Sequence, residues 1–165
     1  MISVAKGEST TDARIQGFEQ EMAAKFPGIT LLGEQNDNTD SVSIAAQFIE
    51  GDISAHPDLN GAFAANVITA QGVASGVDHA GKSGKVKLAT FDADPDQMTM
   101  LTKGTIQLAI AQEPAVEGAD GVQQALNALD DKPVTANIAT PLIAITPQNM
   151  NSSSVKPFIY KSSCG

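Results

Sequence analysis

Five short apolar segments of strand type alternate with five helix-type segments along most of this chain, and this alternation restricts the fold more than any other feature. The strand patterns lie at residues 2–5, 29–32, 62–65, 86–91 and 106–110, and the helix patterns at 11–25, 41–54, 68–80, 96–103 and 116–129. Regular alternation of this kind implies right-handed crossovers and parallel strands. We therefore expect an α/β fold in three layers, with a mainly parallel central sheet flanked by helices.

The segment 84–96 indicates where the chemistry of such a fold would lie. Its apolar strand pattern stops at Phe91 and Asp92, and a proline stands where the next helix begins its first turn. Ligands of open α/β sheets bind at the carboxyl ends of strands, because loops and helix N-termini converge there. The simpler interpretation of the carboxylates is that Asp94 or Asp96 only caps the helix.

Composition and charge fit one globular unit and exclude several partners. The 165 residues carry a formal net charge of −9 and only 4% aromatic residues, so small and branched aliphatic side chains must build the core. A chain this acidic offers no basic patch for nucleic acid or anionic lipid, and a neutral small molecule or a protein fits better. No apolar run approaches the roughly 18 residues of a membrane span. The chain opens without a signal-peptide pattern, so it is either cytoplasmic or begins after its targeting segment.

Short motifs at the polar ends of the predicted strands and on the predicted helices form an ordered series. They are Arg14-Ile-Gln-Gly-Phe18, Ala55-His-Pro-Asp58, Phe63-Ala-Ala-Asn66, Phe91-Asp92 and Ala111-Gln-Glu-Pro114. Over residues 2–149 this series resembles the C-terminal lobe of type I periplasmic sugar-binding proteins, the ribose-binding-like solute receptors of ABC transporters. LacI-type repressor effector domains share that Rossmann-like fold. The resemblance implies one lobe at 1–149 and a terminal segment at 150–165.

The resemblance also implies a set of ligand-binding residues and no catalytic, metal or cofactor role. The set is Arg14, Asn36, Asn66, Phe91, Asp92 and Gln112, with Asn38 as a second candidate in the loop that holds Asn36. A sugar hydroxyl both donates and accepts hydrogen bonds. The predicted residues suit such a hydroxyl, because arginine offers a rigid fork of donors, aspartate accepts hydrogen bonds, and asparagine and glutamine do both. Phe91 would contact the sugar ring.

Two departures from the family pattern bear on this interpretation. Val67 stands where the family commonly has an aspartate after the asparagine of the third strand, which weakens the case for a standard aldose. The resemblance covers one lobe only, and in two-lobed receptors the helix at 116–129 would belong to the side of the missing lobe. We therefore expect the segment 113–146 to fold back on this domain or to be exchanged between two chains.

The segment after the fourth strand admits two other interpretations. Asp92 and Asp94 resemble the Asp-x-Asp start of haloacid-dehalogenase-like phosphatases, where a nucleophile and a general acid act with Mg²⁺. In that family Thr or Val follows where Asp96 stands here. The spacing also fits a calcium loop, but Gln97 replaces its turn glycine and Lys103 its bidentate glutamate.

A LacI-type regulator is the closer alternative, although the sequence shows no DNA-binding headpiece. We expect a non-enzymatic receptor lobe for a small sugar or polyol, which in its full-length context works with an ABC transporter permease on the periplasmic or extracellular side. A homodimer through the helix at 116–129 is a further expectation. Nucleic-acid binding and direct membrane insertion are not expected.

Overall fold

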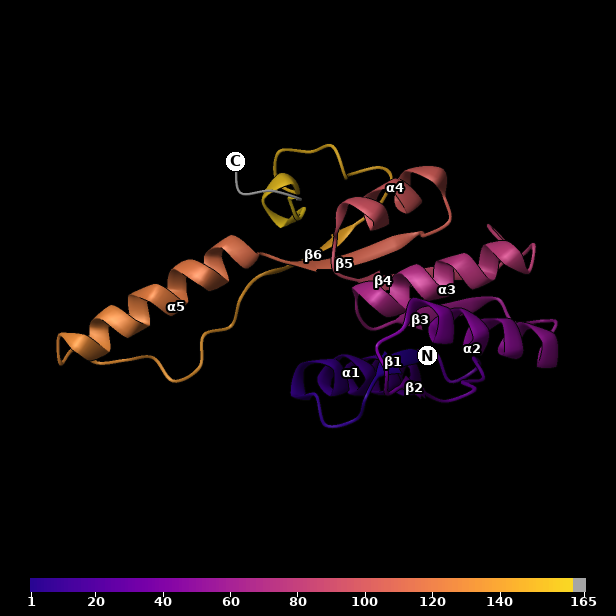
Figure 1. The fold of residues 1–165 in the computed structure, drawn as a ribbon, viewed down its shortest axis with the longest axis horizontal. Coiled ribbons are helices and arrows are strands. Elements are labelled where there is room, and N and C mark those ends of the chain that lie inside the picture. The colour runs from indigo at the N-terminus through magenta and orange to yellow at the C-terminus, as the bar shows by residue number, and fades with distance from the viewer. Residues whose placement is uncertain (162–165) are drawn as a thin grey trace.

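A six-stranded sheet forms the centre of the molecule in the computed structural model, which describes residues 1–161 (Figure 1). Its strands are β1 (Ile2–Val4), β2 (Gln35–Asp37), β3 (Gly61–Ala64), β4 (Lys87–Phe91), β5 (Leu108–Gln112) and β6 (Leu142–Ile145). They lie in the order β2-β1-β3-β4-β5-β6, with every pairing parallel except the antiparallel pairing of β6 with β5. The predicted mainly parallel α/β sheet is confirmed.

Helices cover both faces of the sheet. They are α1 (Ser9–Lys25), α2 (Val42–Ala55), α3 (Val67–His79), α4 (Pro95–Lys103) and α5 (Pro114–Leu129), and a 3-10 turn, η1, spans Lys156–Phe158. The chain winds from β1 to the edge strand β2 and then back across the sheet, and right-handed crossovers therefore place α1 on one face and α2, α3 and α4 on the other. Helix α3 packs between α2 and α4.

The core consists of two unequal parts, one on each side of the sheet. Alternate residues of β3 point to opposite faces, so Ala64 joins the large cluster under α2 and α3, whereas Phe63 joins a small cluster with Ile15 of α1. Phe18 of α1 stacks on the Phe63 ring with 5.1 Å between the ring centroids. The α1 layer thus depends on a few contacts.

Two glycines let α2 and α3 approach closely. A Cβ atom at Gly72 would lie 2.4 Å from the carbonyl oxygen of Val42, and one at Gly76 would lie 2.5 Å from Cγ2 of Ile49. Both distances are shorter than real atoms allow. At these two positions the glycines of α3 allow its contact with α2.

The second strand is the clearest correction to the sequence prediction. The apolar residues at 29–32 were predicted to form it, but Ile29 is 52% exposed and the strand lies in the predicted polar loop, at Gln35–Asp37. The backbone N–H of Gln35 donates to the carbonyl of Met1, and its side-chain Nε2 donates to Asp52 at 2.6 Å. Since an edge strand is held by its backbone, polar side chains can occupy it once their own hydrogen bonds are satisfied.

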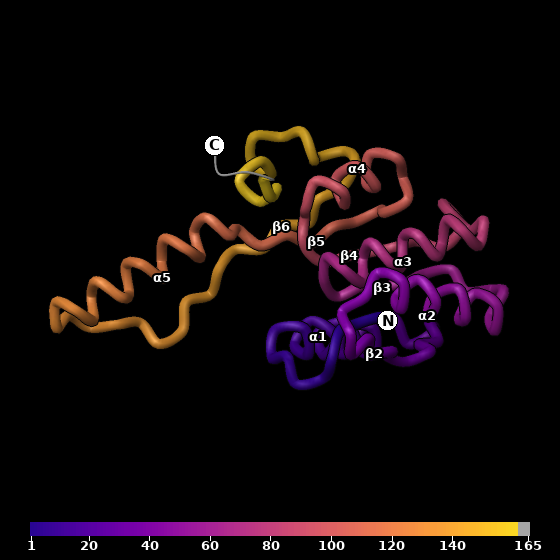
Figure 2. Tube along the Cα trace, viewed as in Figure 1, coloured from indigo at the N-terminus to yellow at the C-terminus, as the bar shows by residue number. Residues whose placement is uncertain are grey.

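Helix α5 extends away from the rest of the molecule and does not fold back on the sheet (Figure 1). None of its residues is buried, and Val122, Leu126 and Leu129 are 63%, 50% and 80% exposed. Figure 2 shows the chain returning beside the helix before it enters β6. Residues 142–145 of the predicted segment 113–146 return to the sheet as β6, and exchange of the segment with a second chain stays a prediction.

The terminal segment that was predicted after residue 149 packs against the lobe, and the boundary itself stays a prediction. Val155 and Phe158 are 1% and 9% exposed and join the large core cluster. Residues 162–165 lie outside the described part. Among residues 1–161, no helix combines the length and apolar character needed to cross a membrane.

Candidate functional site

The carboxyl ends of β3, β4 and β5 lie side by side in the sheet, and each carries a predicted ligand-binding residue. Asn66 follows β3, Asp92 follows β4, and Gln112 is the last residue of β5. Arg14 reaches the same edge from α1, where its Nη1 donates to the carbonyl of Ala65 at 2.8 Å. The sheet and α1 therefore bring these four predicted residues to one edge, where Phe91, the last residue of β4, also lies.

Phe91 supports Arg14 at this edge. The guanidinium carbon of Arg14 lies 3.6 Å from the centroid of the Phe91 ring. Burial lowers the pKa of Arg14, and the nearby Asp92 carboxylate acts in the opposite direction. An arginine still keeps its charge. Phe91 is only 6% exposed and its ring lies under the Arg14 guanidinium. Its contact with a sugar ring stays a prediction.

Asp92 is the most constrained of the predicted residues. It is 8% exposed, and its φ of 77° places it in the left-handed region, where residues other than glycine are strained. Its backbone N–H donates to the carbonyl of Ile110 at 2.8 Å, and its Oδ1 accepts a hydrogen bond from the hydroxyl of Tyr160 at 2.6 Å. Neighbouring structure therefore fixes both its backbone and its carboxylate.

The turn that follows Asp92 is held by the start of α4. Asp94 caps the helix, since its Oδ1 accepts from the backbone N–H of Gln97 at 2.7 Å, which agrees with the simpler interpretation of that carboxylate. The fully buried Gln97 in turn donates from Nε2 to the carbonyl of Phe91 at 2.7 Å. Gln97 was not among the predicted site residues. Its hydrogen bonds hold the turn at residues 91–94, which carries the predicted site residues Phe91 and Asp92.

Tyr160 contacts the predicted site residue Asp92 and was not among the residues predicted from the sequence. It follows η1 in the predicted terminal segment, and its hydroxyl reaches Asp92 across 68 positions of sequence. Burial, together with the hydrogen bond and the charge of Asp92, raises the pKa of Tyr160, whereas Gln112 acts to lower it. The phenol thus stays protonated and donates. The signal that could have found it is an apolar and aromatic run, 158–160, in an otherwise polar tail.

The Asn66 side chain caps α3 with its oxygen and lies at the carboxyl edge of the sheet with its nitrogen. Its Oδ1 accepts from the backbone N–H of Thr69 at 2.9 Å and so caps α3. Its Nδ2 donates to Oδ1 of Asp40 at 3.3 Å, in an exposed contact. A long, exposed hydrogen bond is easily exchanged, so the amide Nδ2 is the part of Asn66 that is suited to a ligand.

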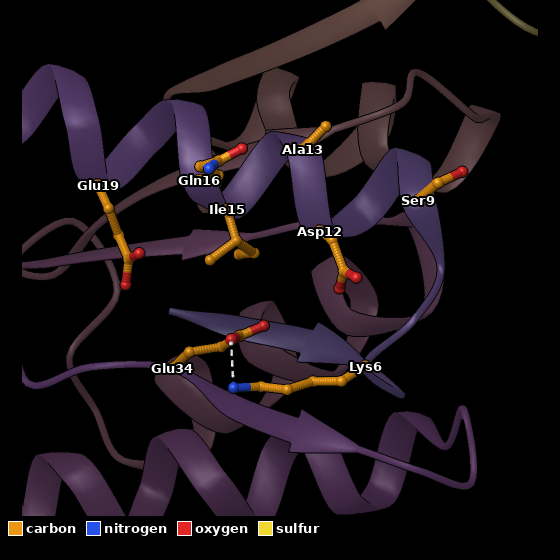
Figure 3. A pocket seen from close by; sticks show the side chains of 8 residues that line it. All are labelled: Lys6, Ser9, Asp12, Ala13, Ile15, Gln16, Glu19 and Glu34. Atoms are coloured by element: carbon orange, nitrogen blue, oxygen red, sulfur yellow. Dashed lines mark ion pairs between the residues drawn. The ribbon is translucent and has the colours of Figure 1, made fainter.

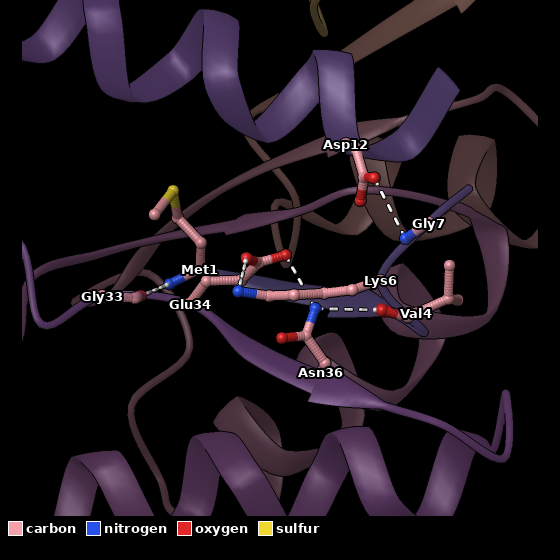
Figure 4. Close-up of polar contacts among 8 residues, drawn as sticks. All are labelled: Met1, Val4, Lys6, Gly7, Asp12, Gly33, Glu34 and Asn36. Atoms are coloured by element: carbon pink, nitrogen blue, oxygen red, sulfur yellow. Dashed lines mark hydrogen bonds and ion pairs between the residues drawn. The ribbon is translucent and has the colours of Figure 1, made fainter. Parts of the chain in front are cut away.

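Asn36 lies away from this group. It sits on β2, beyond β1, and its Nδ2 donates to the carbonyl of Val4 at 3.0 Å and to Oε1 of Glu34 at 2.8 Å (Figure 4). These bonds hold the edge strand to β1. No hydrogen bond of the described chain connects Asn36 with Arg14 or Asp92.

Two cavities of the described chain contain none of the six predicted residues. One, of about 400 Å³, lies between α1 and the β1–β2 edge, where Lys6 and Glu34 form an ion pair of 3.5 Å (Figure 3). The other, of about 650 Å³, lies at the opposite, amino ends of the strands beside Met22 and Leu32. The predicted set is thus part of an edge of the lobe and not of either cavity.

The Asp94 carboxylate at this edge is fully engaged in hydrogen bonds within the chain. Both oxygens of Asp94 accept hydrogen bonds, Oδ1 from Gln97 and Oδ2 from Nε2 of Gln71. Among residues 1–161, no group of three or more acidic, histidine or cysteine side chains is arranged to hold a metal ion. The phosphatase and calcium-loop interpretations therefore find no support in the geometry.

These features define a class of protein: an α/β ligand-binding lobe whose polar side chains meet at the carboxyl ends of parallel strands. The periplasmic binding protein domain family matches residues 1–133, and the chain belongs to that family.

Named relatives share this lobe. The ribose import binding protein RbsB of Escherichia coli K12 is 32% identical over 143 residues, which are 86% of this chain and 47% of the relative. The D-allose-binding periplasmic protein of the same organism is 30% identical over 75% of this chain and 38% of the relative. The chain spans about half the length, or less, of these relatives.

Solved structures of similar fold carry bound sugars. A solute-binding protein of an ABC transporter from Agrobacterium vitis, bound with α-D-tagatopyranose, is 39% identical with a TM-score of 0.91, over 98% of this chain and 54% of that chain. A second from that organism, with bound D-fucose, is 26% identical with a TM-score of 0.88, over 96% of this chain and 55% of that chain. Sugar-binding receptors of ABC transporters are therefore what this chain resembles in both sequence and fold.

Proposed function

We propose that this chain is a sugar- or polyol-binding lobe of an ABC-type solute receptor, which binds its ligand without chemical conversion. The observation that carries the proposal is the convergence of Arg14 and Asp92, a fixed donor and a fixed acceptor, at one edge of the sheet. A polyhydroxylated ligand needs both kinds of partner. The sugar-bound relatives support the same ligand class.

Each residue of the edge has a distinct part in this proposal. Oδ2 of Asp92 accepts from ligand hydroxyls, and the guanidinium N–H groups of Arg14 not used on Ala65 donate to them. The amides of Asn66 and Gln112 complete the polar set. Phe91 contributes by holding the Arg14 guanidinium over its ring. A hydrogen bond to a charged partner contributes roughly 1.5–3 kcal/mol, so two or three such bonds account for useful affinity.

One lobe supplies only half of such a site. The matched relatives are about twice as long, and we propose that a second lobe closes on the ligand and excludes water in the full-length receptor. Affinity of this chain alone is then low, because contacts and closure are both missing. The permease of an ABC transporter is the proposed partner of the full-length form, and the periplasmic or extracellular face its location.

The exposed face of α5 is the proposed contact with another copy of this chain. Val122, Leu126 and Leu129 recur at helical spacing on a helix that buries none of its residues. A second chain that covers this stripe would form a homodimer by exchange of the segment.

A calorimetric screen tests the ligand proposal. The chain is titrated with D-tagatose, D-fucose, D-ribose and D-allose at high concentration, beside the variants Asp92→Asn and Arg14→Lys. We expect weak binding of at least one sugar and a loss of about tenfold or more in each variant. The exposed Asp96→Asn on α4 is the matched control and keeps the affinity. Binding that is unchanged in both site variants would reject this edge as the site.

A further inference from the structure

The last described residues return to the edge of the sheet and are anchored there. Val155 and Phe158 are buried in the large core cluster, and the turn η1, which ends at Phe158, leads the chain to Tyr160. The backbone N–H of Tyr160 then donates to the carbonyl of Ala93 at 3.0 Å, and the phenol hydroxyl donates to Asp92 at 2.6 Å. Tyr160 therefore contacts two residues of the turn that carries the site, one through its backbone and one through its side chain.

The phenol divides the Asp92 carboxylate into two unlike oxygens. Oδ1 accepts the Tyr160 hydroxyl. No side chain or backbone N–H among residues 1–161 donates to Oδ2, although the residue is 8% exposed. A carboxylate that is held through one oxygen cannot rotate freely, so the other keeps a fixed direction. Such preorganisation removes part of the ordering cost of binding.

We propose that Tyr160 is a positioning residue of the ligand site, which holds Oδ1 of Asp92 so that Oδ2 is presented to a sugar hydroxyl. This inference rests on the proposed function and extends it to the C-terminal segment. Tyr160 acts through Asp92 and forms no bond with the ligand itself.

The contacts separate this role from a purely structural one. The segment is anchored by the side chains of Val155 and Phe158 and by the backbone of Tyr160, none of which needs the phenol oxygen. The hydrogen bond of the hydroxyl goes to the site residue Asp92. Removal of that oxygen alone should leave the segment in place and release the carboxylate.

The contact can be measured without any ligand. Tyr160 is the one tyrosine of the chain, and the chain has no tryptophan, so tyrosine fluorescence reports on this position alone. A phenol that is hydrogen-bonded to a carboxylate emits weakly. We expect emission at neutral pH to rise in Asp92→Ala and to stay at the wild-type level in the control Asp96→Asn. Equal emission in wild type and Asp92→Ala would overturn the contact.

The effect on binding is tested by a double-mutant cycle with the sugar that the screen selects. Tyr160→Phe should weaken binding about tenfold in the wild-type background, and less than about twofold in Asp92→Ala. Thr102→Val, which removes a hydroxyl that donates to the carbonyl of Met98 away from the site, is the control and should not change affinity. Equal losses in both backgrounds, or no loss in either, would overturn the positioning role.

The two measurements keep the inference and the proposed function distinguishable. A wild-type chain that binds no sugar in the screen rejects the proposed function and with it the ligand part of the inference, whereas fluorescence still decides whether Tyr160 holds Asp92. If the wild-type chain binds a sugar but tyrosine emission does not change in Asp92→Ala, the proposed function is retained and the positioning role of Tyr160 is rejected.

Discussion

The guanidinium group of Arg14 lies over the ring of Phe91, with 3.6 Å between the guanidinium carbon and the ring centroid. This contact joins the first helix to the last residue of β4, and together with the hydrogen bond to the Ala65 carbonyl it fixes the long charged side chain of Arg14. Cation–π contacts of this kind are worth roughly 0.5–2 kcal/mol, more when desolvated. The contact makes an arginine of α1 part of an edge built by strands.

Replacement of Phe91 by leucine should weaken ligand binding as well as stability. Leucine fills most of the space but offers no ring face, so the cation–π contact that positions Arg14 is lost. We expect the free energy of unfolding to fall by about 1–2 kcal/mol and sugar affinity to fall several-fold. Urea unfolding and calorimetry measure the two effects.

Phe63→Leu is the matched control for this prediction. Phe63 is equally buried in the sheet and stacks on Phe18 instead of on an arginine. The stability loss should be similar, but affinity should not change. If both variants lose affinity equally, the loss reflects general loosening of the sheet and not the contact between Phe91 and Arg14.

The pH dependence of stability should depend on Asp37. Burial alone would raise its pKa, but hydrogen bonds from the Thr39 hydroxyl and from the backbone N–H groups of Ser41 and Thr39 outweigh burial and hold the pKa below the usual 3.8. A lowered folded-state pKa adds stability above the unfolded-state value, and the gain is lost as pH falls through the folded-state value. Wild-type stability should therefore decline below about pH 4.

Asp37→Asn tests this prediction. The variant should lose about 1–3 kcal/mol at pH 7. Its deficit relative to wild type should shrink below about pH 4, where the Asp37 carboxylate of the unfolded wild-type chain becomes protonated and the wild-type gain in stability is progressively lost. Urea unfolding at pH 7, 5, 4 and 3.5 measures the deficit. The exposed Asp58→Asn serves as control. A deficit that stays constant to pH 3.5 would contradict the assignment to ionised Asp37.

Local sequence patterns were sufficient for the elements whose side chains decide their position. The alternation of apolar runs predicted the parallel sheet, and the cap at Asp94 and the strand ends at Asn66, Asp92 and Gln112 follow from residues next to each other in sequence. Helix and strand periodicity and capping are local, so a single sequence can reveal them.

Contacts between distant residues were not predicted. Edge strand β2 pairs with β1 through its backbone, so the polar side chains at 35–37 gave no strand signal. Tyr160 meets Asp92 only because Val155 and Phe158 anchor the terminal segment in the core. The apolar and aromatic run 158–160 indicates burial, but nothing in that local pattern specifies Asp92 as the partner.

Alanine should have opposite effects at two helical glycines, one in the close contact between α2 and α3 and one on the open surface of α1. At Gly72 the added methyl would lie 2.6 Å from Cβ of Ala45, so the helices must move apart, and we expect a loss of about 1–3 kcal/mol. At Gly17 in α1 no atom lies within 4 Å of the added methyl, and alanine should stabilise the helix by about 0.5–1 kcal/mol. Thermal unfolding compares both with wild type. A stabilising Gly72→Ala would contradict the close packing.

The exposed stripe on α5 predicts concentration-dependent dimerisation. Leu126 is 50% exposed in the middle of the stripe, and burial of apolar area at about 25 cal/mol per Å² favours a second chain there. Leu126→Glu places a charge in the contact and should convert the dimer to monomer in size-exclusion chromatography with light scattering. Gln124→Glu adds the same charge on the other side of the helix and should leave the dimer intact. Wild type that is monomeric at every concentration, or a dimer that survives Leu126→Glu, would exclude this face as the contact.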